Sequence, residues 1–439
     1  MIRDITVLLI LLLSSNSCKK DNLTDILAPQ VISTQPLNGA IDVPVSTEIV
    51  IEFDEQIIVA LTSYITVNGN IAKATNLGKK IKLEASLALN VNNTVVISGN
   101  SIKDLAGNFM SEFSFFFKTE AGAPFNIDPT LVSPTPSTQA TNLFNFLKTN
   151  FQQKIISGTM AAHSTNINEA AWVHDQTGKW PALTGFDFID HTWLDQNWVE
   201  YEAPFTLGSD WWSNNGLVTL TWHWRDPLTK SGAFYTNETS FDVSKVSDPA
   251  SAEYAAMIED IDTIAGYLRE FRDAKIPVLW RPLHEAAGGW FWWGAKGAAP
   301  CKALWQLMFD RLVNHHGLNN LIWVWTTNTS SDALDWYPGD NYVDIIGMDI
   351  YPGENQHGSQ YIEFDKVKEI FQAKKIITLS ECGSVPDPAL MMEYGDTWSW
   401  FMPWNGDFTR SDAHNGATWW NKFFSYDYVI TRDKMPDLK

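Results

Sequence analysis

Residues 277–285 read PVLWRPLHE, an apolar run that ends in a charged residue. Seven other runs of similar character lie between residues 154 and 404, and helix-like stretches separate most of them. The eight runs are Lys154–Met160, Ala182–Asp190, Leu217–Trp224, Pro277–Glu285, Asn320–Thr327, Val343–Tyr351, Lys375–Gly383 and Thr397–Trp404. Continuous apolar strands that alternate with helices are typical of a parallel sheet. Eight such units in about 290 residues fit the size of a (β/α)8 barrel, the fold predicted for residues 142–439.

The helical stretches have their own pattern, which is clearest in Ser251–Lys275. Its apolar side chains recur every three or four residues, at Tyr254, Ile258, Ile261, Ile264 and Leu268. This spacing predicts an amphipathic helix with one face on the sheet.

Two glutamates stand where a (β/α)8 barrel carries its chemistry, at the carboxyl ends of strands. Glu285 ends the fourth run, and Glu381 lies near the end of the seventh, KIITLSECG at 375–383. Burying a carboxylate without a partner is costly, which argues against a purely accidental placement. The alternative is that one glutamate is a structural partner of Arg281. Only a closed barrel can bring two residues so distant in sequence together.

A pair of facing carboxyl groups is suited to cleaving a glycosidic bond. One group donates a proton to the leaving oxygen, so its pKa must be raised. The other stays ionised and attacks the anomeric carbon. If the reaction retains configuration, the two groups should lie about 5–5.5 Å apart.

Three polar residues are candidates for the surroundings of this pair. Alternation along a strand places Arg281, Leu283 and Glu285 on one face, so Arg281 is expected to hold a carboxylate ionised. His223 and His284 end or nearly end strands, where each can bind a sugar hydroxyl, bind a glutamate or simply pack. No histidine pair has metal-ligand spacing with a third ligand, so we expect no metal and no cofactor.

The sixth run, VDIIGMDIY at 343–351, adds Asp349 and Tyr351 at positions i and i+2. Such a pair points to one face of a strand. Asp349 is expected to bind a sugar hydroxyl, and Tyr351 to orient the neighbouring Glu381.

Tryptophan is abundant, with 21 residues in the chain. Packing is its ordinary use, but an indole face can also stack on a sugar ring. The loop AAGGWFWWG at 286–294 carries Trp290, Trp292 and Trp293, and the eighth run carries Trp400 and Trp404. This clustering at strand ends favours sugar stacking for some of them, although several are expected only to pack.

The net charge of −20 and pI of about 4.8 argue against nucleic acid or an anionic membrane surface as the main partner. A neutral substrate fits better. The three cysteines form neither a disulfide framework nor a zinc pattern. Cys301 and Cys382 are expected to be free, buried thiols, although a bond between them stays open. Nothing in the sequence indicates an oligomer, and we expect a monomer.

The first 18 residues read as a targeting segment. Arg3 precedes a short apolar run, Ile5–Leu13, which is followed by small and polar residues and Cys18. This run is too short to span a bilayer and resembles a bacterial lipoprotein signal, with Cys18 lipidated. An ordinary secretory signal is the alternative. Residues 19–28 are expected to be a tether, which would make the protein an extracytoplasmic, membrane-anchored lipoprotein on the cell surface or in the periplasm.

Residues 29–119 have the short, turn-punctuated runs of an all-β sandwich. Strands are expected at Glu48–Phe53, Lys80–Leu83, Thr94–Ile97 and Phe113–Phe117. The stretches PLNGAIDVPVSTEIVIEFDEQI and IKDLAGNFMSEFSFFFKT resemble a bacterial immunoglobulin-like domain. We expect a spacer, with sugar binding as the alternative, and a turn role for Asp104 and Asn108. The Pro-rich residues 120–141 are expected to be a linker.

The motifs of the larger part resemble glycoside hydrolase family 26. They are WRPLHEAAGGWFWWG, IITLSECG, IIGMDIYPG, TLTWHW and HSTNINEAAWVHDQTGKWPALTGFDF, which together span about residues 142–439. The resemblance implies a retaining (β/α)8 enzyme with Glu285 as acid/base and Glu381 as nucleophile. It also implies a cleft lined by His223, Arg281, His284, Trp290, Asp349, Tyr351 and Trp404.

Family 26 consists chiefly of endo-β-1,4-mannanases, so the resemblance implies hydrolysis of mannan, glucomannan or galactomannan. A β-1,3-1,4-glucanase or a β-1,3-xylanase using the same residues is the nearest alternative. A non-catalytic, surface glycan-binding lipoprotein is an alternative of another class, and the presence of both glutamates weighs against it.

Overall fold

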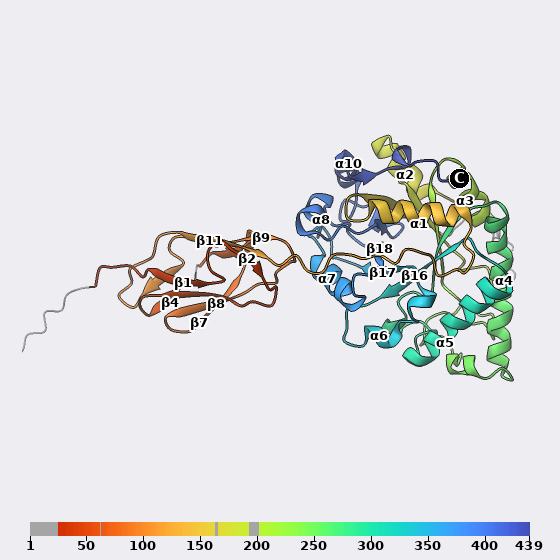
Figure 1. Ribbon diagram of the computed structural model, residues 1–439, viewed down its shortest axis with the longest axis horizontal. Helices are drawn as coiled ribbons and strands as arrows, with labels where there is room; N and C mark the ends of the chain where they lie inside the picture. The colour runs from red at the N-terminus through yellow and green to blue at the C-terminus, as the bar shows by residue number, and fades with distance from the viewer. Residues whose placement is uncertain (1–24, 62, 163–165, 193–201) are drawn as a thin grey trace, which may run out of the picture. The chain divides into compact units, whose positions relative to one another are not determined.

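The computed structural model describes residues 25–61, 63–162, 166–192 and 202–439. The expected signal segment, with Cys18, lies outside these residues. The chain divides into two compact units (Figure 1). Unit 1 comprises the described residues of 25–85 and 92–118, and unit 2 comprises residues 86–91 and 119–439.

Unit 1 is built from β-sheets, as expected for an immunoglobulin-like domain. Its buried side chains alternate along the strands, and in β3 the inward residues are Ile49, Ile51 and Phe53. Asp104 has the expected turn role, because its carboxylate accepts hydrogen bonds from the backbone N–H groups of Gly107 and Asn108. The four-stranded sheet has the order β1 (Val31–Gln35), β3 (Ile49–Phe53), β8 (Lys80–Glu84), β7 (Lys73–Asn76); the five-stranded sheet has the order β2 (Ala40–Val43), β11 (Phe113–Thr119), β9 (Asn92–Ile97), β5 (Ile65–Val67), β6 (Asn70–Ile71); and β10 (Ile102–Asp104) pairs with β4 (Ile57–Val59).

Unit 2 is the predicted barrel of eight parallel strands. The first of them, β12, pairs with both β13 and β19 and so closes the sheet, and the short strand β20 (Val429–Ile430) pairs with the start of β12. The eight strands are β12 (Ile155–Met160), β13 (Leu183–Asp187), β14 (Leu217–Trp222), β15 (Val278–Pro282), β16 (Leu321–Thr327), β17 (Ile345–Ile350), β18 (Ile376–Cys382) and β19 (Trp400–Pro403). Each of the eight predicted runs contains one of these strands.

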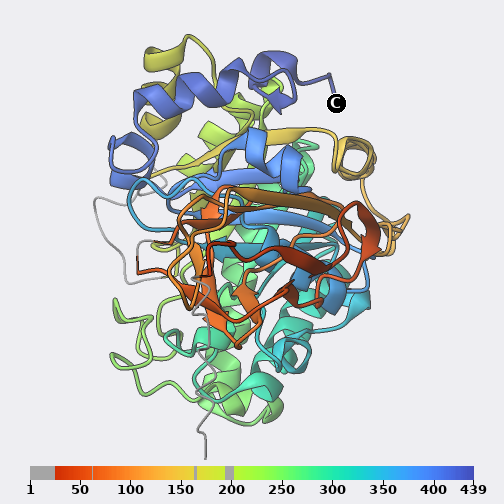
Figure 2. The same cartoon turned by 90° about the vertical axis from the view of Figure 1, so that its left-hand side faces the viewer.

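Helices connect the strands and cover the outside of the barrel (Figure 1). The predicted amphipathic helix is α4, whose N-cap Ser251 accepts a hydrogen bond from the backbone N–H of Tyr254. Near the end of the chain, α10 packs beside α2 (Figure 1 and Figure 2). The helices are α1 (Thr138–Asn150), α2 (Asn168–Thr177), α3 (Ala203–Ser213), α4 (Ala252–Asp273), α5 (Ala298–Phe309), α6 (Ala333–Trp336), α7 (Tyr361–Ile370), α8 (Pro388–Tyr394), α9 (Asp407–Arg410) and α10 (Ala417–Ser425); η1 (Val243–Ser247), η2 (Ala286–Gly288), η4 (Asp340–Tyr342) and η5 (Arg432–Lys434) are 3-10 turns and η3 (Asp310–His315) is a π-helix.

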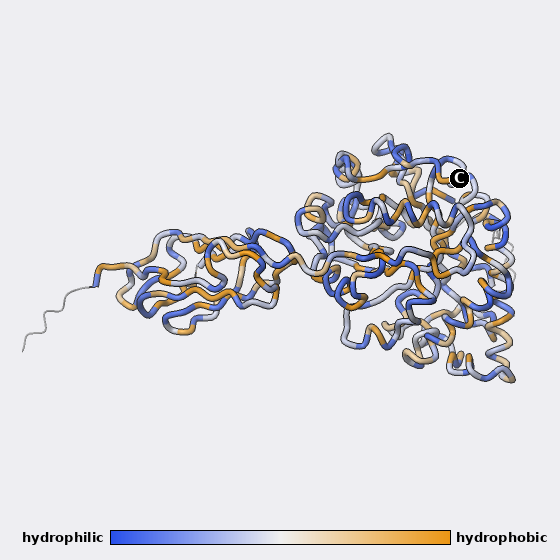
Figure 3. Tube along the Cα trace, in the orientation of Figure 1, coloured by the Kyte–Doolittle hydropathy of each residue, from blue (hydrophilic) through white to orange (hydrophobic). Residues whose placement is uncertain are grey.

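The core of unit 2 is unusually rich in tryptophan. Among the described residues, twelve tryptophan side chains are fully buried, including Trp292, Trp293 and Trp400. These three were candidates for sugar stacking, but they pack inside the protein. Figure 3 shows hydrophobic residues, in orange, along the strands inside unit 2, with hydrophilic stretches at its periphery. No helix in the described part of the chain is both long and apolar enough to cross a membrane.

The fourth strand ends earlier than predicted. β15 stops at Pro282, and Leu283 and Glu285 adopt left-handed backbone angles, with φ of 49° and 54°. The expectation that Arg281, Leu283 and Glu285 alternate onto one face is therefore wrong. The physical reason is that the chain turns sharply after Pro282, so Leu283 enters the hydrophobic core while Glu285 begins the turn η2.

The stretch 120–141, expected as a linker, is attached to unit 2 over most of its length. Asn126 and Asp128 donate backbone hydrogen bonds to Ala373 and Lys374. The backbone N–H of Val132 donates to the carboxylate of buried Asp344, and α1 already begins at Thr138. The proline-rich composition thus reflects an extended, docked segment rather than a free linker.

Cys301 and Cys382 are both buried and form no disulfide, as expected. Burial raises the pKa of both thiols, to about 12 for Cys301, so neither is a reactive thiolate at neutral pH.

Candidate active site

The carboxyl ends of β15, β17 and β18 bring three carboxylates together. Glu285, Asp349 and Glu381 each contribute an oxygen atom, and these atoms lie within 4.8 Å of one another. The barrel therefore places both predicted glutamates in one site. Their spacing is close to the range of about 5–5.5 Å for retaining glycosidases and well below that of about 6.5–9.5 Å for inverting ones.

Glu381 is the more strongly bound member of the glutamate pair. It lies in β18, is 6% exposed, and accepts a hydrogen bond of 2.5 Å from Arg281 Nη2 on one oxygen. The hydroxyl group of Tyr351 donates to its other oxygen. Burial raises the pKa of Glu381, whereas the charge of Arg281 and the Tyr351 hydrogen bond lower it. Both donors favour the ionised carboxylate.

Arg281 connects Glu381 with Asp349. Its Nη1 donates 2.7 Å to Asp349 Oδ2, and Ser380 Oγ donates 2.7 Å to Asp349 Oδ1. Asp349 was expected to bind a sugar hydroxyl, but its side chain is only 2% exposed and both oxygens have protein partners. Asp349 is therefore a partner of Arg281 and not a group that faces the substrate. A buried guanidinium is stabilised when its hydrogen bonds are met by anions, and Asp349 is its second anion beside Glu381.

Glu285 has a different environment. It is half-buried, adopts a left-handed backbone conformation, and accepts one hydrogen bond of 3.0 Å from Trp290 Nε1. Burial, followed by the charge of Asp349, raises its pKa. Because Glu381 is bound by a cation and a phenol while Glu285 is bound by an indole, a proton shared by the pair belongs on Glu285.

The two histidines lie against each other beside the glutamates. His223 Nε2 is 3.2 Å from His284 Nε2. His223 Nδ1 lies 2.5 Å from Asp187 Oδ2, and His284 Nδ1 lies 3.2 Å from Thr221 Oγ1. His284 is buried and acts on the site through its contact with His223, whereas the His223 side chain retains 12% exposure.

Aromatic rings surround this polar centre. The Trp404 ring, immediately after β19, lies 5.9 Å from the His223 ring, and Phe291 lies 5.4 Å from the same ring. Trp290 and Tyr351 are 48% and 43% exposed, which leaves ring surface available to a ligand. The loop after β14 adds Tyr235, which is 41% exposed and stacks on Phe291 with centroids 5.4 Å apart.

Sequence reasoning missed Asp187, Thr221, Ser380 and Tyr235. The first three lie inside apolar strands, where each is a polar residue in an otherwise hydrophobic run. That interruption is the signal that could have identified them. Tyr235 lies in a long irregular loop, where no periodic pattern marks it.

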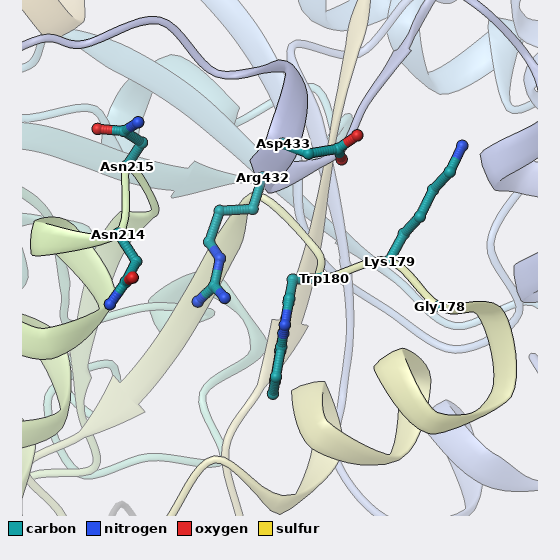
Figure 4. Close-up of a pocket in the computed structure, with 7 residues that line it drawn as sticks. All are labelled: Gly178, Lys179, Trp180, Asn214, Asn215, Arg432 and Asp433. Atoms are coloured by element: carbon teal, nitrogen blue, oxygen red, sulfur yellow. The ribbon is translucent and has the colours of Figure 1, made fainter.

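A separate pocket of about 430 Å³ lies at the opposite end of the barrel, where the strands begin (Figure 4). It is lined by Gly178, Lys179, Trp180, Asn214, Asn215, Arg432 and Asp433. The Arg432 guanidinium stacks on Trp180 and Trp211, at 4.7 and 4.3 Å from the ring centroids. This end of a barrel generally serves stability rather than catalysis.

A closed parallel barrel with a close pair of glutamates at the carboxyl ends of its fourth and seventh strands is typical of retaining glycosidases. Comparison with known families agrees with this class. The chain belongs to glycosyl hydrolase family 26, whose model matches residues 132–434, and a bacterial Ig-like domain model matches residues 25–119.

The similar proteins carry one recurring name. A mannan endo-1,4-beta-mannosidase of Thermothelomyces thermophilus is 38% identical over 70% of this chain and 64% of its own length. The structure of a beta-mannanase from a symbiotic protist of the termite Reticulitermes speratus, complexed with gluco-manno-oligosaccharide, is 40% identical, with a TM-score of 0.68 over 72% of this chain and all of that chain. A Podospora anserina GH26-CBM35 beta-(1,4)-mannanase is 28% identical, with a TM-score of 0.73 over 94% of this chain and 98% of that one. The chain spans about half to two thirds of the length of the first curated relatives it matches.

Proposed function

We propose that this protein is a retaining endo-β-1,4-mannanase that cleaves mannan, glucomannan or galactomannan. The observation that carries the proposal is that a carboxylate oxygen of Glu285 lies within 4.8 Å of one of Glu381 in a family 26 barrel. The names of the similar proteins support a β-mannan substrate. The low charge of such a polysaccharide also suits a chain with a net charge of −20.

In the first step, Glu381 attacks the anomeric carbon of the sugar in the reactive subsite. The bond to the glycosidic oxygen breaks, its electron pair stays on that oxygen, and the oxygen takes the proton of Glu285. Arg281 and Tyr351 hold the Glu381 carboxylate ionised and oriented for attack. The products are an ester between the sugar and Glu381 and a released saccharide.

In the second step, Glu285 acts as a base. It takes a proton from a water molecule, whose oxygen attacks the anomeric carbon and displaces Glu381 as a carboxylate. The sugar leaves with its original configuration after two inversions. Trp290 Nε1 donates a hydrogen bond to Glu285 and is placed to orient it both as acid and as base.

Product analysis tests this function. The protein is incubated with galactomannan, glucomannan, lichenan and β-1,3-xylan, and proton NMR follows the first anomeric signals. We expect manno-oligosaccharides of several lengths that first appear as the β-anomer. Release of the α-anomer would contradict a retaining mechanism, and cleavage of lichenan or xylan but not mannans would transfer the proposal to a glucanase or xylanase.

For the N-terminal region we propose lipidation at Cys18 and anchoring to an extracytoplasmic membrane face. Support comes from the sequence alone: Arg3, the apolar run at 5–13 and Cys18 itself. Metabolic labelling with an alkyne fatty acid should mark the native protein and not the variant Cys18→Ala. Equal labelling of both would refute it.

We also propose that unit 1 is a spacer between the anchor and the enzyme. Deletion of residues 29–85 and 92–118, with a short joining segment, should leave hydrolysis of soluble mannan within about twofold, since the glutamates and their hydrogen-bond partners Arg281, Tyr351 and Trp290 belong to unit 2. A large loss on insoluble mannan alone would instead indicate sugar binding by unit 1.

A further inference from the structure

A line of four hydrogen-bonded side chains runs under the candidate site. It begins at Asp187, the last residue of β13, whose carboxylate accepts from the backbone N–H of His223 at 2.9 Å and faces His223 Nδ1 at 2.5 Å. His223 Nε2 faces His284 Nε2, and His284 Nδ1 faces the Thr221 hydroxyl, both at 3.2 Å. The four residues come from three adjacent strands or their ends, β13, β14 and β15.

The hydrogen-bond partners along this line determine how many protons the two imidazole rings carry. Thr221 Oγ1 is 2.9 Å from the carbonyl oxygen of Arg281 and donates its proton there, so it can only accept from His284 Nδ1–H. The Asp187 carboxylate can only accept, so His223 Nδ1 also carries a proton. The two Nε2 atoms then share one further proton, because two lone pairs at 3.2 Å would repel each other.

The pair of imidazoles therefore carries one positive charge, and the surrounding groups place it on His223. Asp187 and Glu381 face His223 as anions, while Arg281 opposes its charge. Burial lowers the pKa of His223, but the charge and hydrogen bond of Asp187 outweigh it, and the net direction is upward. Burial, together with the charge of His223, lowers the pKa of His284 well below its ordinary value.

We propose that Asp187 is a positioning residue that keeps His223 as an imidazolium beside the two glutamates, with neutral His284 as the acceptor of its Nε2 proton. The inference rests on the proposed function and deepens it. In this role His223 is not only a contact for sugar hydroxyls but a second cation of the site, in addition to Arg281.

The cation acts on both glutamates. The charge of His223 lowers the pKa of Glu381 and that of Glu285, in each case against the larger raising effect of burial. Its consequence is greatest for Glu381, which has to be ionised to attack. Without Asp187, burial and the charge of Arg281 lower the pKa of His223 below its ordinary value. The ring is then neutral at the pH where Glu381 titrates, and Glu381 takes up a proton at higher pH than before.

The first test is nitrogen NMR of the free protein labelled with 15N-histidine, in which His223→Asn identifies the His223 signals. We expect both ring nitrogens of His223 to remain protonated well above pH 6.5, about the pKa of a free histidine, and those of His284 to show a neutral ring with its proton on Nδ1. A neutral His223 ring at pH 7 in the wild-type protein would overturn the proposal without any need for a variant.

The second test compares Asp187→Asn with Asp190→Asn. Asp190 lies on the same segment but pairs with Arg225 rather than with His223. In Asp187→Asn the imidazolium signals should disappear by about pH 7, and the acid limb of kcat/KM should move up by about one pH unit, a roughly tenfold loss on the acid side. Asp190→Asn should leave both measurements unchanged.

The outcomes separate this inference from the proposed function. An acid limb that stays in place in Asp187→Asn, with the variant folded by circular dichroism, contradicts the role of Asp187. Failure of the wild-type protein to cleave any mannan contradicts the proposed function, whereas the charge of His223 is read from the free protein and does not depend on substrate.

Discussion

Arg281 Nη2 lies 2.5 Å from Glu381 Oε2, with the two side chains 2% and 7% exposed. A buried cation at this distance lowers the pKa of the carboxyl group against the raising effect of burial and fixes its orientation. The same guanidinium binds Asp349 through Nη1. Arg281 thus forms a planar fork whose two nitrogens hold Asp349 and the nucleophile candidate Glu381 in a fixed geometry. The site is thus arranged to keep one glutamate ionised and leave the other available for a proton.

Replacing Arg281 by lysine tests this fork. A lysine ammonium cannot reach Asp349 and Glu381 in the same planar arrangement, so one of them loses its charged hydrogen bond, worth about 1.5–3 kcal/mol. We expect kcat to fall by roughly 10- to 100-fold in Arg281→Lys, since 1.4 kcal/mol corresponds to tenfold. Steady-state kinetics on a soluble mannan measure it. A kcat equal to that of the wild type would show that the fork is unimportant.

Tyr351→Phe removes a single hydroxyl group from Glu381. The variant keeps the aromatic ring, which contacts Phe408 with centroids 5.1 Å apart, so folding should be retained. The Glu381 carboxylate loses a donor, its pKa rises, and the acid limb of the kcat/KM profile should move to higher pH. A pH profile from 3 to 8 provides the measurement. Movement of the limb to lower pH contradicts the hydrogen-bond assignment.

Glu285→Ala removes the proposed proton donor, and its effect should depend on the leaving group. On mannan, kcat should fall by about 10²–10⁴-fold. On an aryl mannobioside with an acidic phenol, bond cleavage needs no proton, so the sugar ester of Glu381 should accumulate and appear in the mass spectrum of the intact protein. An equal loss on both substrates without any ester would assign Glu285 another role.

The basic limb of the activity profile should respond to Asp349. The charge of this residue raises the pKa of Glu285, so its removal lets Glu285 lose its proton at lower pH. Activity requires protonated Glu285 in the first step and disappears as the pH rises through its pKa. Asp349→Asn, whose amide can still accept from Arg281 and donate to Ser380, should therefore shift the basic limb to lower pH. The exposed residue Asp335 gives the matched control Asp335→Asn, which should leave the limb in place.

The pocket at the other end of the barrel should affect stability and not catalysis. Arg432→Ala removes a partly buried cation between Trp180 and Trp211, a contact worth up to about 2 kcal/mol. We expect a lower denaturation midpoint in urea with unchanged kcat. Arg269→Ala, on the exposed face of α4, should change the free energy of unfolding by less than about 0.5 kcal/mol. Equal effects of both variants would contradict a role for the stacking.

The fold could be predicted largely from the sequence because each barrel strand is buried on both faces. Such strands have continuous apolar sequences, and each of the eight predicted apolar runs contains a strand. Their ends were harder to predict. β15 stops at Pro282 because the chain turns left-handed at Leu283, and no sequence pattern marks a left-handed conformation at a leucine or a glutamate.

The site was predicted only in part, for a related reason. Glu285 and Glu381 stand out because an acidic residue at the end of an apolar strand is unusual. The partners of Asp349 and His223 do not stand out, because pairing depends on which side chains meet across neighbouring strands. Tryptophan was a misleading marker: Trp292 and Trp293 occupy the same loop as Trp290 but are fully buried, and burial is decided by packing around them.

The sequence by itself determined the barrel, the two glutamates and their order along the chain, since strand periodicity and the position of a charge within it are local properties. Only the tertiary structure decided that the glutamates meet, that Arg281 joins Asp349 to Glu381, and that Asp187 lies against His223. Those relations arise when strands far apart in the chain become neighbours in a closed sheet, and the distances set there fix which groups are charged.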